Sequence, residues 1–156
     1  IGQRLVRLLC KECKQEYQAT PEEKQMMIHV MSGHPHPTLV PEPTMIYRST
    51  GCSVCGGTGF KGRNGIFEAI VMDEAVEEAV LRDPREHIIA EAAKPQGIPT
   101  MIEDGIEKVL KGMTSIKELE RVIELPYQDA SAASVTNTTT PTNLKVGDDD
   151  FLSHVV

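Results

Sequence analysis

The sequence predicts a mainly α-helical fold with a short β element. Five segments place apolar residues at helical spacing behind a capping residue, one after Thr20 and four after residue 72. Two short stretches, "TMIYRST" and "GIFEAIVM", are β-prone, and "IGQRLVRLL" is compatible with the end of either a helix or a strand. Aromatic residues make up 4% of the chain and Trp is absent, so the core must be aliphatic. We expect a four-cysteine subdomain, a small C-terminal helical bundle and a disordered C-terminal tail.

The predicted helices begin at recognisable caps. Thr20 precedes Pro21 and, three positions on, Glu23, which is the pattern of a capping box with proline at the first helical position. The four later helices are expected to start at Asp73, Asp83, Thr100 and either Thr114 or Ser115. Each is too short to be stable alone, so we expect them to pack together as a bundle.

Composition divides the chain into three parts. Residues 1–72 are expected to form the cysteine-containing subdomain, with an inserted helix and a proline-rich connector, "SGHPHPTLVPEP". Residues 73–126 are the predicted helical subdomain. Residues 127–156 are mostly small and polar, which predicts a disordered tail whose final "FLSHVV" could dock on a partner. The chain begins with Ile, so we expect it to be a piece of a longer protein.

The chain's four cysteines occur as two Cys-x-x-Cys pairs, Cys10 with Cys13 and Cys52 with Cys55. Such spacing lets both thiolates of a turn face one metal, and two pairs complete the tetrahedral sulfur shell of structural zinc. No export signal and no apolar run near the roughly 18 residues of a membrane span are visible, which favours a reducing compartment and hence metal. An iron–sulfur or other metal site, disulfides and free thiols remain the alternatives.

The histidines and a cluster of methionines are further potential metal ligands, but we expect them to have structural roles. His29, His34 and His36 could compete for a metal, but with four thiolates present we expect surface histidines. The methionines at positions 26, 27 and 31 are expected to serve as core or partner surface.

Catalysis finds little support in the residues. The chain contains no Gly-Lys pair and therefore no phosphate-binding P-loop, and no Ser/His/Asp grouping stands out. Glu103 and Asp104 are adjacent carboxylates, but they fall in the first turn of a predicted helix, where they favour the helix dipole. We therefore expect no catalytic residues and no enzymatic activity in this chain by itself.

Charge is unevenly distributed, with a net −7 overall. Residues 1–65 carry +3 (8 basic, 5 acidic), residues 66–126 carry −7 (7 and 14) and residues 127–156 carry −3 (1 and 4). Phosphate backbones need clustered Lys and Arg, so nucleic acid is not an expected partner.

The order of three separated motifs resembles the C-terminal part of the ATPases that drive type II secretion and type IV pilus assembly. These motifs are "QRLVRLLCKECK", "YRSTGCSVCGGTGFKGRNGIFEAIVMDE" and "QGIPTMIEDGIEKVLKGMTSIKELERV", together spanning roughly residues 1–125. The resemblance does not separate secretion from pilus assembly. Pro95 departs from the family's pattern, so the second helix after residue 72 is expected to end near Ala93.

The resemblance implies that the parent protein is a cytoplasmic, hexameric ATPase, peripheral to the bacterial inner membrane. ATP and Mg would bind only in a catalytic domain preceding this segment. The four cysteines would match the family's zinc-binding subdomain. Implied partners are the protein's own ATPase core, neighbouring subunits and the inner-membrane secretion or pilus platform.

Two other functions share part of the cysteine pattern. "CSVCGGTG" fits the zinc region of DnaJ-type co-chaperones, which bind unfolded polypeptide, but that family repeats the motif four times and one copy occurs here. A zinc-ribbon nucleic-acid binder would share the two knuckles, and the charge balance argues against it.

Overall fold

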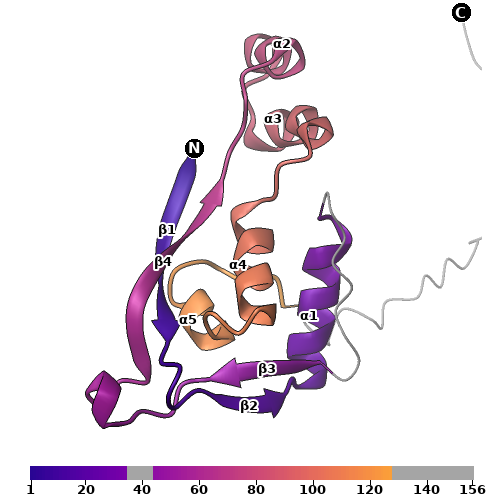
Figure 1. The fold of residues 1–156 in the computed structure, drawn as a ribbon. Helices are drawn as coiled ribbons and strands as arrows, with labels where there is room; N and C mark the ends of the chain where they lie inside the picture. Colours follow the sequence, from indigo (N-terminus) through magenta and orange to yellow (C-terminus); the bar gives the residue numbers. More distant parts are fainter. Residues whose placement is uncertain (35–43, 128–156) are drawn as a thin grey trace, which may run out of the picture.

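The computed structural model describes residues 1–34 and 44–127, which form two small sheets and five α-helices (Figure 1). Most of the predicted proline-rich connector lies outside the described residues. The predicted disordered tail also lies outside them, apart from Tyr127.

Two antiparallel sheets, each of two strands, show that the expectation of a mainly α fold is wrong. Strand β1 (Gly2–Leu9) pairs with β4 (Phe60–Glu68), and β2 (Gln15–Gln18) pairs with β3 (Met45–Arg48). The β1–β4 ladder joins segments about 60 residues apart, so local preference alone could not reveal it. Strand β4 also runs through part of a glycine-rich stretch, with Gly62 and Gly65 inside it.

Three helices begin where the sequence predicts. In α1 (Pro21–Ser32), the Thr20 hydroxyl accepts from the Glu23 N–H and the Glu23 carboxylate accepts from the Thr20 N–H. The same reciprocal box opens α4 (Met101–Leu110) at Thr100. Asp73 caps α2 (Glu74–Arg82) by accepting from the Val76 N–H at 2.9 Å.

Two helices differ from their predicted extents. Helix α3 (Glu86–Ala93) starts after Arg85 rather than at Asp83, because the Asp83 carboxylate instead receives the Arg85 guanidinium at 2.9 Å. It ends at Ala93 as expected, followed by the 3₁₀ turn η2 (Lys94–Gln96). Helix α5 (Ile116–Glu120) begins after Ser115, one of its two predicted caps, but it is only five residues long.

One aliphatic core joins the sheets to three of the helices. Helix α4 packs against α1, β3 and β4, and α5 packs against α4 and β1 (Figure 1). The core contains the predicted methionines of α1, and its buried members are Val6, Ala19, Met26, Met27, Val30, Met31, Ile46, Ile66, Ile106, Val109, Ile116, Leu119 and Leu125. The prediction of an aliphatic core is therefore confirmed.

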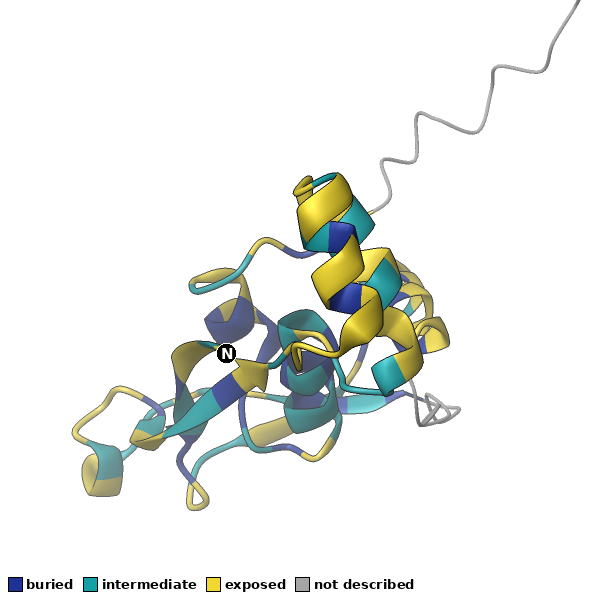
Figure 2. Cartoon of the chain, turned by 90° about the horizontal axis from the view of Figure 1, so that it is seen from above, coloured by how far each residue is buried: buried dark blue, intermediate teal, exposed yellow. Residues whose placement is uncertain are grey.

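The helices after residue 72 do not form a single bundle, which corrects the second half of the predicted fold. Helices α2 and α3 pack on each other, away from the core, and expose most of their surface (Figure 2). Helices α4 and α5 instead cover apolar residues of the strands, such as Val6 and Ile66, which would otherwise face water. Burial of strand residues thus decides where the helices pack.

Candidate metal centre

The four cysteines lie in two turns that connect one sheet to the other. Cys10 and Cys13 lie between β1 and β2, and Cys52 and Cys55 lie between β3 and β4. Because β1 pairs with β4 and β2 pairs with β3, both turns are held at the junction of the sheets. Strand pairing thereby brings together two knuckles that are 38 residues apart in sequence.

The sulfur atoms form a compact cluster. All four Sγ atoms lie within 4.8 Å of one another. The Cys10–Cys52, Cys13–Cys55 and Cys52–Cys55 separations are 3.9, 3.8 and 3.7 Å. A tetrahedron with metal–sulfur bonds of about 2.3 Å has edges of about 3.8 Å, so the donor set fits a tetrahedral thiolate-binding metal. The separations are too long for disulfides, and all four cysteines are free thiols.

Backbone N–H groups support the charge of one thiolate. The N–H groups of Cys52 and Gly59 donate to Cys55 Sγ at 3.2 and 3.1 Å. Desolvation opposes ionisation of this thiol, but the two donors outweigh it and hold the pKa of Cys55 at about 6, below its ordinary value. Cys55 can therefore supply a thiolate ligand near neutral pH.

Further hydrogen bonds fix the two knuckles to each other. The Cys10 N–H donates to the Gly59 carbonyl at 2.9 Å, and the Thr50 hydroxyl donates to the Cys13 carbonyl. Within the second knuckle, the Thr58 hydroxyl donates to the Cys55 carbonyl at 2.8 Å. These contacts lie outside the sulfur shell and orient its ligands. Cys10 is buried, and the other three cysteines are partly exposed.

The histidines do not enter the cluster. Within the described residues, the group of potential metal ligands contains only the four cysteines. His29 is exposed on α1, as expected, whereas His34 is buried, so the expectation of a surface residue is wrong there. His34 follows Gly33, the C-cap of α1, and its N–H donates to the Met31 carbonyl at 3.3 Å. His36 lies outside the described residues.

The adjacent carboxylates of α4 have structural partners. Glu103 completes the capping box with Thr100, as its place in the first turn predicts. Asp104 accepts from the Phe67 N–H of β4 at 2.8 Å and pairs with Lys108 one turn along the helix. The sequence indicates the local contacts of this pair but not the link from Asp104 to β4.

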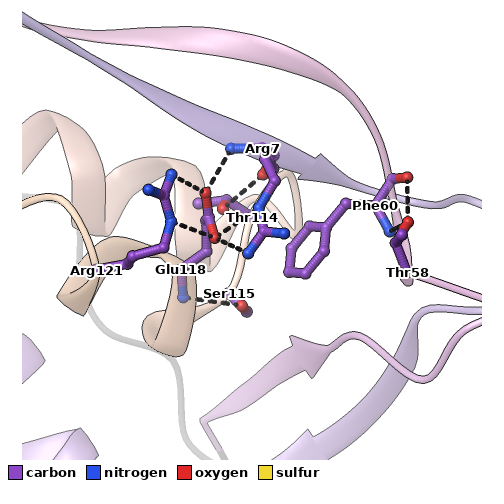
Figure 3. Close-up of polar contacts among 7 residues, drawn as sticks. All are labelled: Arg7, Thr58, Phe60, Thr114, Ser115, Glu118 and Arg121. Atoms are coloured by element: carbon purple, nitrogen blue, oxygen red, sulfur yellow. Dashed lines mark hydrogen bonds and ion pairs between the residues drawn. The ribbon is translucent and has the colours of Figure 1, made fainter.

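A buried ion-pair network, which sequence reasoning missed, joins β1 to α5 (Figure 3). The Glu118 side chain is fully buried and accepts from the Arg7 guanidinium at 2.6 and 2.9 Å and from the Arg7 N–H at 3.0 Å. Arg121 donates to the same carboxylate at 2.8 Å. Arg7 also lies over the Phe60 ring, 4.2 Å from its centroid. No local signal could reveal a contact across 111 positions.

No helix in the described part of the chain is long and apolar enough to cross a membrane.

Fold and cluster together define a small α+β domain whose four cysteines lie close enough to hold a metal ion. Residues 1–121 match the sequence profile of the type II/IV secretion system proteins. The chain belongs to this family, and the expected resemblance is confirmed.

Individual relatives agree with this assignment. The chain is 34% identical over 122 residues to the type II secretion system ATPase E of Vibrio cholerae, covering 78% of this chain and 22% of the relative. It is 36% identical over 125 residues to the type IV pilus assembly ATPase PilB of Thermus thermophilus, covering 80% and 13%. A type II secretion system protein E of Aeromonas hydrophila is 38% identical over 122 residues, covering 78% and 22%. The chain therefore spans less than a quarter of the length of these relatives.

Proposed function

We propose that this chain is a zinc-stabilised, non-catalytic module of an ATPase that powers type II secretion or type IV pilus assembly. The observation that carries the proposal is the convergence of four thiols at the junction of two sheets, in a chain of this family. Cys10, Cys13, Cys52 and Cys55 are the proposed ligands.

The donor set is one that zinc commonly takes in proteins. Four cysteine sulfurs at tetrahedral spacing match the ligands of structural zinc, and they leave no open position for water or substrate. Bound zinc would supply folding free energy, on the order of 10–16 kcal/mol in small zinc peptides. The β2–β3 sheet, whose strands are only four residues long, gains most from such a link.

The ATPase activity that we propose for the parent protein rests on the names of its relatives. Two of them are called ATPases, and the chain spans only part of each. We propose that ATP and Mg bind in a separate catalytic domain of a hexameric, cytoplasmic parent. In this proposal the module contacts its own ATPase core, neighbouring subunits and the inner-membrane platform.

The first test measures zinc per chain and follows far-ultraviolet circular dichroism during chelation. We expect one zinc per chain and loss of the β and helical signal on removal, reversed by added zinc. Cys10→Ser/Cys52→Ser should abolish stoichiometric zinc, whereas Ser53→Ala, an exposed neighbour within η1 (Ser53–Cys55), should not. Metal-free protein with an unchanged spectrum would overturn the structural role of zinc.

A second assay addresses catalysis. The purified, zinc-loaded chain should show no ATP hydrolysis above buffer, because the proposed site holds only a saturated metal. Turnover that persists in Cys10→Ser/Cys52→Ser would place activity elsewhere in the chain, and turnover lost with the metal would make the site catalytic. Either result would refute the non-catalytic assignment.

A further inference from the structure

A surface cavity of about 550 Å³ lies beside the cysteine cluster, with Cys10 in its wall. It is formed by the end of β1, the two knuckles, the start of β4 and the turn after α4. Its lining includes Leu8, Lys11, Lys14, Val54, Lys61 and Met113. None of these is a proposed metal ligand.

The cavity is basic, although the chain as a whole is acidic. Four lysines line it, against one carboxylate, Glu12. Two are already engaged: Lys14 donates to the Gly112 carbonyl at 2.9 Å, and Lys111 pairs with Glu107 at 2.6 Å. Lys11 and Lys61 are exposed and have no ion-pair or hydrogen-bond partner among the described residues. Two ammonium groups without a side-chain partner among the described residues therefore face one cavity.

The walls between these lysines are apolar. Leu8 and Met113 are half-buried, and Val54 is 52% exposed at the tip of the second knuckle. An occupant that matches this surface combines negative charges with at least one large apolar side chain. A bare phosphate or carboxylate would leave the apolar part uncovered.

The chain itself contains such a segment. Residues 148–152 read "DDDFL", the chain's longest run of acidic residues followed directly by Phe and Leu. The segment lies beyond residues 1–121, the part matched by the family profile. It follows Tyr127 by 21 positions, and an extended chain of that length spans up to about 70 Å, so it can reach the cavity.

We propose that residues 148–152 dock in cis into this cavity, with the aspartates on Lys11 and Lys61 and the apolar pair on Leu8, Val54 and Met113. The docked segment covers the face of the domain next to Cys10.

Zero-length carbodiimide cross-linking tests the contact, because it joins an aspartate to a lysine only when the two groups touch. The full 156-residue chain is treated at low concentration and low salt, and cross-linked peptides are identified by mass spectrometry. We expect residues 148–150 to link to Lys11 and Lys61 at least fivefold more than to Lys94 and Lys117, which are exposed and outside the cavity. Added salt of about 0.5 M should lower the yield severalfold.

Matched variants separate the effect of the Lys61 charge on docking from the ability of Lys61 to form a cross-link. Lys61→Arg keeps the charge but cannot cross-link, so links to Lys11 should persist. Lys61→Gln removes the charge, and links to Lys11 should fall at least threefold. Phe151→Ala/Leu152→Ala retains all the carboxylates, yet should reduce both links at least threefold.

Three results would overturn the proposal. Links spread evenly over all exposed lysines would show an undocked segment, and absence of links from residues 148–150 would show that these carboxylates do not reach the lysines. Links between isotopically labelled and unlabelled chains in a mixture would show docking on a second copy.

Discussion

Gly51 lies against Gly57 so closely that a Cβ atom on Gly51 would be 2.4 Å from the Gly57 carbonyl oxygen. Gly51 has a φ of +99°, a conformation that side-chain-bearing residues rarely adopt. Both residues flank the Cys52–Cys55 knuckle, so this close backbone approach sets how the knuckle leaves β3 and returns toward β4.

Gly51→Ala should therefore disturb the metal centre without removing a ligand. We expect a loss of about 2–3 kcal/mol in the free energy of unfolding, because backbone has to shift and the new φ is strained. Zinc affinity, measured by chelator competition, should fall by about 10- to 100-fold.

Gly56→Ala is the matched control for that substitution. Gly56 also has a positive φ, +62°, but a Cβ there meets nothing within 4 Å. Gly56→Ala should lower the free energy of unfolding by about 1 kcal/mol and leave the zinc affinity within a few-fold of that of the original chain. Equal effects of the two substitutions would contradict the role assigned to the Gly51–Gly57 contact.

Glu118→Gln should destabilise the domain by removing the charge at the centre of the network in Figure 3. Breaking a buried pair costs about 3–5 kcal/mol, but the Arg7 and Arg121 side chains are 42% and 54% exposed, and water can compensate them in part. We expect Glu118→Gln to lower the free energy of unfolding, measured with urea, by about 2–3 kcal/mol. Glu107→Gln, which breaks an exposed pair with Lys111, should change stability by no more than about 0.5 kcal/mol.

The Glu118 carboxylate makes the free energy of unfolding depend on pH. Burial opposes ionisation of Glu118, but hydrogen bonds from Arg121 and Arg7 outweigh it and lower its pKa from 4.5 to about 2. Because the folded pKa lies below the unfolded one, this stabilisation is present above about pH 4.5 and is lost as the pH falls toward 2.

Carboxyl-carbon NMR measures this titration directly. As long as the domain stays folded, the Glu118 resonance should remain that of a carboxylate at pH values at which exposed glutamates are becoming protonated. The stability difference between the original chain and Glu118→Gln should narrow as the pH falls below about 4.5, because the unfolded chain then takes up a proton at Glu118; metal loss affects both chains alike and cancels in the difference. A Glu118 midpoint near 4.5 would show that the network does not hold the charge.

Gly105→Ala tests the packing of α4 on α5. In an exposed helix this change stabilises by up to about 1 kcal/mol, but a Cβ on Gly105 would lie 2.6 Å from Leu119 Cδ1. Since Leu119 is fully buried, we expect a net loss of about 1–2 kcal/mol. In a Leu119→Ala background the loss should vanish or change sign, and additive effects in this double-mutant cycle would contradict direct contact.

Local features of this fold could be predicted from sequence because they depend on neighbouring residues. The capping boxes at Thr20 and Thr100 each require two residues three positions apart, and both formed. The cysteine cluster was predictable for a related reason, since metal ligands carry their own spacing rule. The end of α3 at Ala93 followed from a single proline.

Features that depend on distant partners escaped prediction. Strand β2, "QEYQ", has no apolar alternation and is a strand because the first knuckle directs it alongside β3. The residues of β1 are compatible with either a helix or a strand, and pairing with the distant β4 decides for the strand. Asp83 failed as a cap because a nearby arginine competed for its carboxylate, and this outcome depends on rotamers that the sequence does not show.

The placement of the two knuckles has a consequence for how the domain moves. The chain crosses from one sheet to the other only twice between β1 and β4, and a cysteine pair lies at each crossing. With a metal bound to all four sulfurs, swinging the β1–β4 ribbon against β2–β3 would stretch a sulfur–sulfur edge of the tetrahedron. The two sheets then move as one rigid unit. A force applied to β1 is therefore transmitted through β2 to α1, because the sheets do not slide past each other.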